Sequence, residues 1–161
     1  MAPIVAADPP PLDRRIWPTT ALLVILAFLL TLYQGFGVAI TTAPFFGDTP
    51  SRDDYISAGT AALTTLPAFA AMIWCGWQRG SRPGLWLIAA PAALMVLVGL
   101  NLLATEGDSR DPHPTRALSL ADLFTAMTWL NWGTTILFVA IAVAGHLLRR
   151  RVRHTGKGSG A

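Results

Sequence analysis

The fold is decided by residues 119–153, SLADLFTAMTWLNWGTTILFVAIAVAGHLLRRRVR. Within this stretch, residues 129–148 supply the roughly 20 consecutive apolar positions that a helix needs to cross about 30 Å of hydrocarbon. Four arginines follow directly, Arg149, Arg150, Arg151 and Arg153. Because positively charged segments stay on the cytoplasmic side of a membrane, the cluster predicts that this end of the span is cytoplasmic.

The composition of the whole chain fits a membrane protein better than a soluble one. The 161 residues are 53% apolar and 13% charged, with a mean hydropathy of +0.49. A soluble domain carries about 25% charged residues. So little charge leaves too little polar surface to cover a soluble globule, and the chain is predicted to be an all-α membrane protein.

Three further apolar stretches predict three more spans, separated by short segments rich in Gly, Pro and charge. The predicted spans are residues 19–41, 55–77, 85–104 and 129–148. The last helix is expected to extend outward to Ser119, because Ser119 and Asp122 have the spacing of a capping box. Ser51 or Asp53 is expected to cap the second helix, and Pro67 is expected to kink it.

The distribution of charge predicts that both termini are cytoplasmic. With four spans, a Pro-rich arm of residues 1–18, a turn of residues 78–84 and a basic tail of residues 149–161 share one side. These segments carry nine of the twelve Lys and Arg residues, whereas seven of the nine acids lie on the other side. The six tryptophans fall at the two boundaries that this arrangement defines, where indole rings prefer to lie.

Uncharged polar side chains inside the spans are the main candidates for a site. With this topology all of them fall in the outer half of the bilayer: Gln34, Thr64, Thr65, Asn101, Asn131, Thr134 and Thr135. They are expected to form hydrogen bonds between helices. One alternative is a polar pocket around Gln34 and Asn101 that opens outward to a lipid or quinone headgroup or to a partner. Another is an ion path, which fits less well because no charged residue lies within a span.

No pattern of catalytic, cofactor-binding or metal-ligating residues is found, so no cofactor is predicted and the chain is not expected to be an enzyme. His146 has no second histidine at a matching depth, as a bis-His haem would need. It is expected to be an interfacial residue near a helix C-terminus. Cys75 is the single cysteine, which excludes a CxxC motif, and it is expected to be a small buried apolar residue.

Charged segments outside the spans are the candidates for contact with partners. The loop from Glu106 to His113 offers oxygen and nitrogen atoms to a divalent ion, but its spacing is not that of an EF-hand. A solvated loop or a docking surface is expected there instead. The residues predicted to touch a partner are Asp108, Asp111 and Asp122. The four terminal arginines are expected to attract anionic lipid headgroups, at about 1 kcal/mol per charge. No basic and aromatic pattern predicts nucleic-acid binding.

The Arg- and Ala-rich design with four spans and acids on the outside resembles small accessory membrane proteins of actinobacteria. That group includes the extra subunits around the catalytic core of the cytochrome bcc–aa3 oxidase supercomplex. The resemblance implies a multi-pass protein of the bacterial plasma membrane whose partners are other integral membrane subunits. The expected function is therefore a non-catalytic accessory or assembly subunit. The alternative is a small transporter, or a lipid- or quinone-binding protein that uses the outer polar pocket.

Overall fold

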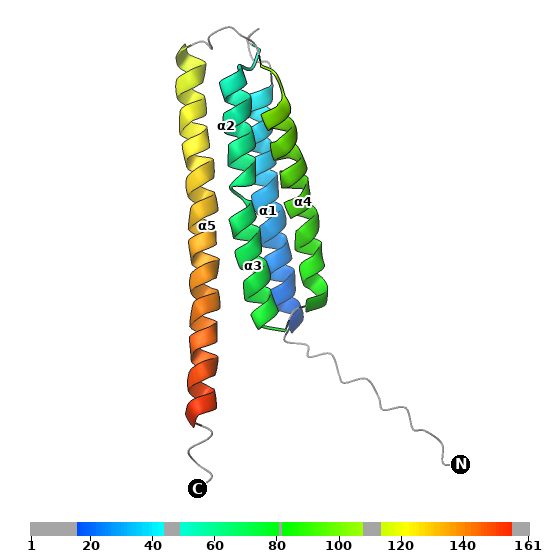
Figure 1. Cartoon of the computed structure of the whole chain (residues 1–161), viewed down its shortest axis with the longest axis vertical. Helices are drawn as coiled ribbons and strands as arrows, with labels where there is room; N and C mark the ends of the chain where they lie inside the picture. The colour runs from blue at the N-terminus through cyan, green and yellow to red at the C-terminus, as the bar shows by residue number, and fades with distance from the viewer. Residues whose placement is uncertain (1–15, 44–48, 81, 108–113, 156–161) are drawn as a thin grey trace, which may run out of the picture.

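The computed structural model describes residues 16–43, 49–80, 82–107 and 114–155, and over residues 16, 82–83, 114–121 and 150–155 it describes the backbone alone. These residues form helices and no strand. The helices are α1 (Ile16–Thr42), α2 (Arg52–Leu63), α3 (Leu66–Gln78), α4 (Arg82–Ala104) and α5 (Pro114–Thr155). Figure 1 shows them running up and down, nearly parallel to one another.

Four helical segments are long and apolar enough to cross a membrane. They are Trp17–Thr42, Arg52–Gln78, Gly84–Ala104 and Asp122–Arg149. The predicted all-α fold with four spans is therefore confirmed. The helices of the first three predicted spans, α1, α2 and α4, begin three residues earlier than predicted, at Ile16, Arg52 and Arg82. Each apolar run is preceded by a first turn that contains charged residues, a proline or both.

The second span is broken into α2 and α3, although a single kinked helix was the expectation. Pro67 has no N–H to offer to the carbonyl of Leu63, and its ring crowds that carbonyl. Two residues earlier, the Thr65 N–H bonds to Ala62 O at 3.3 Å and not to Ala61 O, which a regular α-helix would offer it. The helix therefore ends before the proline, and α3 begins with Pro67 in its first turn.

The start of α2 is fixed by a capping box and by an arginine. Ser51 Oγ accepts a hydrogen bond from the Asp54 N–H at 3.2 Å, and an Asp54 carboxylate oxygen accepts one from the Ser51 N–H at 2.9 Å. Ser51 is thus confirmed as the cap, whereas Asp53 is exposed. The Arg52 guanidinium donates to Leu103 O at 2.8 Å and to Thr105 O. These carbonyls at the end of α4 have few helical partners, so Arg52 joins the start of α2 to the end of α4.

The broken span is the centre of the bundle. α2 packs mainly on α4 and α1, whereas α3 packs mainly on α5. The contact between α2 and α4 is a close approach of two backbones, because a Cβ built on Gly59 would lie 2.9 Å from Gly99 O. Small residues permit such approaches in membrane bundles.

α5 is 42 residues long, which corresponds to about 63 Å. It begins at Pro114, so Ser119 lies inside the helix and the predicted capping box at Ser119 and Asp122 is wrong. Residues 119–128 were expected to extend outward beyond the hydrocarbon. Within them Met127 is fully buried and Leu123 and Phe124 pack against the core, so this part of α5 belongs to the bundle.

The other end of α5 projects further than the sequence suggests. A Cβ on Gly145 would lie 3.5 Å from Gln78 Oε1, so Gly145 is level with the last residue of α3. α5 then continues for ten residues to Thr155 and runs past the ends of the other helices (Figure 1). The helical segment that carries the terminal arginines therefore stands clear of the bundle.

Candidate functional site

Three uncharged side chains from three helices meet inside the bundle, and we call Gln34, Thr64 and Asn131 the polar cluster. Gln34 of α1 and Asn131 of α5 have no exposed surface. Gln34 Nε2 donates to Asn131 Oδ1 at 2.8 Å, and Asn131 Nδ2 donates to Thr64 Oγ1 at 2.8 Å. The polar cluster thus links α1, α5 and the end of α2 by side-chain hydrogen bonds.

The polar cluster also serves the carbonyl groups freed at the break of the second span. Ala61 O, which has lost its usual partner, accepts from Asn131 Nδ2 at 3.3 Å and from Thr64 Oγ1 at 2.7 Å. Thr65 Oγ1 donates to Ala62 O at 2.6 Å. In hydrocarbon no water can satisfy a free carbonyl, and each one left alone costs several kcal/mol. These bonds therefore make the break tolerable within a membrane.

One atom of the polar cluster has no hydrogen-bond partner among the described residues, Gln34 Oε1. Turning the Gln34 amide around would place this oxygen beside Asn131 Oδ1 and close to Met127 O, which also lies within reach of Gln34 Nε2 at 3.4 Å. Both are acceptors, so that orientation is worse. The favourable arrangement keeps a buried acceptor without a donor, at a cost of about 1–3 kcal/mol.

The other polar residues expected at the site lie elsewhere. Thr134 and Thr135 donate to carbonyls of their own helix, Leu130 O at 2.7 Å and Asn131 O at 2.8 Å. Asn101 is exposed on α4, which packs against α2, α1 and α3 and not substantially against α5. The structure does not bring Asn101 into the polar cluster, because Gln34 is fully buried and bonds to Asn131 whereas Asn101 is exposed.

Sequence reasoning missed two parts of this region. One is the backbone carbonyl of Ala61, which only the position of the helix break identifies as a partner for a side chain. The other is Thr31, one turn before Gln34, which is buried and donates to Ala27 O at 2.8 Å. Its place in an apolar run three residues before Gln34 is the signal that could have found it.

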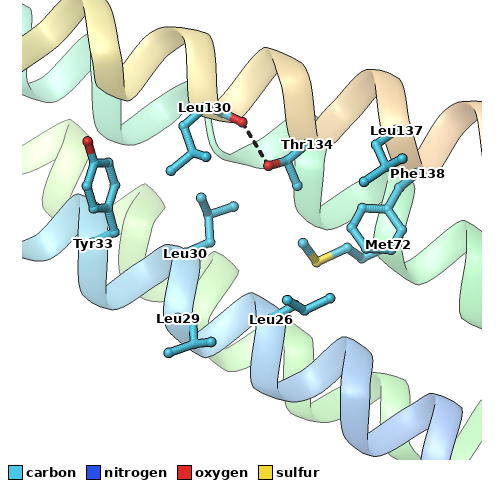
Figure 2. Close-up of a pocket in the computed structure, with 9 residues that line it drawn as sticks. All are labelled: Leu26, Leu29, Leu30, Tyr33, Met72, Leu130, Thr134, Leu137 and Phe138. Atoms are coloured by element: carbon cyan, nitrogen blue, oxygen red, sulfur yellow. Dashed lines mark hydrogen bonds between the residues drawn. The ribbon is translucent and has the colours of Figure 1, made fainter.

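Beside the polar cluster lies an apolar groove between α1 and α5, with α3 at its floor, which we call the α1–α5 groove. Its volume is about 320 Å³. Figure 2 shows the side chains of α1 and α5 facing one another across it, with Met72 of α3 at one end. The residues that line it are Leu26, Leu29, Leu30, Tyr33, Met72, Leu130, Thr134, Leu137 and Phe138. Thr134 and Tyr33 carry its only hydroxyl groups.

The charged candidates that the structure describes lie on α5. Asp122 and Arg149 are exposed on α5. Arg150, Arg151 and Arg153 continue the same helix and are described by their backbone, whereas Asp108 and Asp111 lie outside the described residues. His146 is exposed but is nine residues from the end of α5, so it is not near a helix C-terminus as expected. Cys75 is buried, as predicted.

The chemistry available inside the bundle is hydrogen bonding between uncharged groups and apolar contact. Among the described residues, no three of His, Cys, Asp and Glu are grouped so that they could hold a metal ion. Comparison with models of protein families, with curated proteins and with solved structures finds no match. The geometry of the chain itself is therefore the basis for a proposed function.

Proposed function

We propose that the chain is a non-catalytic accessory or assembly subunit of a larger bacterial inner-membrane complex, with a respiratory oxidase supercomplex as the first candidate. The observation that supports this most is the use of the polar cluster. Its hydrogen bonds go to neighbouring helices and to the freed Ala61 O. A bundle whose buried polar groups form hydrogen bonds between its own helices suits a structural role.

The surface of α5 supports a partner in the membrane. Of its most apolar stretch only 22% is buried, against 50% for the span formed by α2 and α3. Ala140 and Ala144 are both exposed on α5 and lie one turn apart. Small residues at this spacing let a second helix approach closely, so this face of α5 is where we place the contact with another subunit.

Purification of the protein from its own membranes in a mild detergent tests the proposal. Size analysis and mass spectrometry should find the chain together with other integral membrane proteins. Ala140→Phe should release those partners, whereas Ala39→Phe, at an exposed position on α1, should retain them. Migration of the wild type as a lone chain of 17.2 kDa would contradict the proposal.

A second candidate function is the binding of a quinol or a hydroxyl-bearing lipid, and the observation that favours it is the unpartnered Gln34 Oε1. A ligand hydroxyl would supply the missing donor. In reconstituted vesicles, Gln34→Met should then abolish binding of a quinol, whereas Asn101→Leu should leave it unchanged. Equal binding by wild type and Gln34→Met would exclude this function.

The proposal of an accessory subunit assumes that both termini are cytoplasmic. This orientation can be tested separately. Glu106 and Arg79 are exposed at opposite ends of the bundle, and the native Cys75 is buried. A membrane-impermeant maleimide added to intact cells should label Glu106→Cys at once and Arg79→Cys only after permeabilisation. The reverse pattern would show that the chain is inserted the other way.

A further inference from the structure

We propose that the α1–α5 groove binds one acyl chain of an anionic phospholipid whose headgroup lies at Arg149. This inference goes beyond the proposed function, because it holds whether or not the chain is a subunit. The lipid belongs to the leaflet at the C-terminal end of α5. The groove holds the far end of its chain, and Arg149 holds its phosphate.

The size of the groove selects the occupant. A helix with its side chains is about 10–12 Å across, so even one turn of it occupies roughly 400 Å³ or more. The groove offers about 320 Å³, which is less than one turn of a helix with its side chains. Its lining is apolar apart from two hydroxyl groups, and Thr134 Oγ1 already donates to Leu130 O. A narrow, flexible hydrocarbon chain fits this space, and an acyl chain is the one that the bilayer supplies.

The distance from the groove to the charge matches the length of one leaflet. Phe138 lines the groove, and Arg149 is exposed on the same helix eleven residues later. Eleven residues are about three helical turns, so both lie on one face of α5 about 16 Å apart. Half of the hydrocarbon thickness is about 15 Å. A phosphate at Arg149 therefore places the end of its acyl chain in the groove.

The surface between these two points is apolar on the facing helix as well. On α1, Leu22 lies one turn from the groove residue Leu26 and is 56% exposed. Trp17, 62% exposed at the start of α1, lies about 14 Å from Leu26 along the helix, where an indole ring reaches the headgroup level. An acyl chain can thus run from Arg149 to the groove in contact with apolar side chains.

Native mass spectrometry of the full-length protein, released from nanodiscs, tests the site. The nanodiscs contain equal amounts of phosphatidylglycerol and phosphatidylcholine with the same palmitoyl and oleoyl chains. The wild type should retain one phosphatidylglycerol per chain. Arg149→Gln should reduce the preference for phosphatidylglycerol about fivefold, since one charge near the surface contributes about 1 kcal/mol.

Filling the groove should remove the bound lipid. Thr134→Phe places a ring in the groove, and its matched control is Thr60→Phe on α2, where an exposed threonine also donates to its own helix, to Ile56 O at 2.7 Å. Thr134→Phe should lose the retained lipid of either headgroup, whereas Thr60→Phe should keep it. Leu137→Phe fills the same groove and serves if Thr134→Phe does not fold, which circular dichroism shows.

Three results would overturn the proposal. The first is equal retention of phosphatidylglycerol and phosphatidylcholine by the wild type. The second is an unchanged bound lipid in folded Thr134→Phe or Leu137→Phe. The third is that the wild type retains a protein partner and no lipid, and that these variants lose that partner. Because partner proteins are measured by purification from native membranes, failure of the lipid site is distinguishable from failure of the proposed function.

Discussion

α2 and α3 belong to one span, yet they pack on their neighbours in different ways. α2 buries Ala58, Gly59, Ala61 and Ala62 and lets its backbone approach α4 at Gly99. α3 buries the large side chains of Phe69 and Met72, and Met72 lies beside Phe138 of α5 (Figure 2). α2 and α4 approach closely because their side chains at the contact are small, whereas α3 and α5 make contact through large side chains.

The difference shows what the break between the two helices achieves. A continuous helix would keep one axis and one packing mode along its whole length. With the break at Thr64 and Thr65, α2 faces mainly α4 and α3 faces mainly α5. Part of the cost of the break is the freed Ala61 O, and the polar cluster offsets that part. The comparison of α2 with α3 therefore assigns a structural role to Asn131, and variants of each helix test it.

The largest effect is expected in α3. Phe69→Ala should reduce the free energy of unfolding by about 3 kcal/mol, because Phe69 is 1% exposed and its removal leaves a cavity. Phe28→Ala is the matched control, since Phe28 is 53% exposed on α1 and faces the surroundings. Unfolding in mixed detergent measures both. Equal losses for the two variants would show that α3 is not packed as described.

A smaller loss is expected in α2. The side chain of Gly59→Val would begin 2.9 Å from Gly99 O, so α2 and α4 must move apart, at a cost of about 2 kcal/mol. Gly133→Val is the control, because a Cβ at Gly133 meets nothing within 4 Å. The free energy of unfolding should separate them. If Gly59→Val is as stable as Gly133→Val, the close approach of the two backbones does not exist.

The polar cluster should contribute less than the burial of Phe69 and about as much as the close approach at Gly59. Asn131→Leu removes bonds to Gln34, Thr64 and Ala61 O, and hydrogen bonds in membrane bundles average about 0.6 kcal/mol each. We expect a loss of about 2 kcal/mol by the same unfolding measurement. Asn101→Leu replaces an exposed asparagine and should change stability by less than about 0.5 kcal/mol. A larger loss of stability for Asn101→Leu would show that Asn101 makes buried polar contacts, as the predicted pocket around Gln34 and Asn101 requires.

The sequence predicted the spans well and the site only in part. Apolar length and the charges between spans fix which segments cross the membrane, and residues such as Gln34 and Asn131 stand out there because they are polar. Which of them meet depends on helix rotation, and hydropathy carries no information on rotation in so apolar a chain. Asn101 therefore looked equivalent to Asn131. Likewise Pro67 signals a kink, but the partners of the freed carbonyls come from other helices.

Asn131 stabilises the chain because the second span is broken, and a double-mutant cycle with Pro67 tests this role most directly. Pro67→Ala restores an N–H for Leu63 O and lets the Thr65 N–H return to Ala61 O. Ala61 O then has its backbone donor again and depends less on the hydrogen bond from Asn131. We predict that Asn131→Leu costs about 0.5–1 kcal/mol less stability in the Pro67→Ala background than in the wild type. An equal cost in both backgrounds would show that Asn131 does not offset the break of the second span.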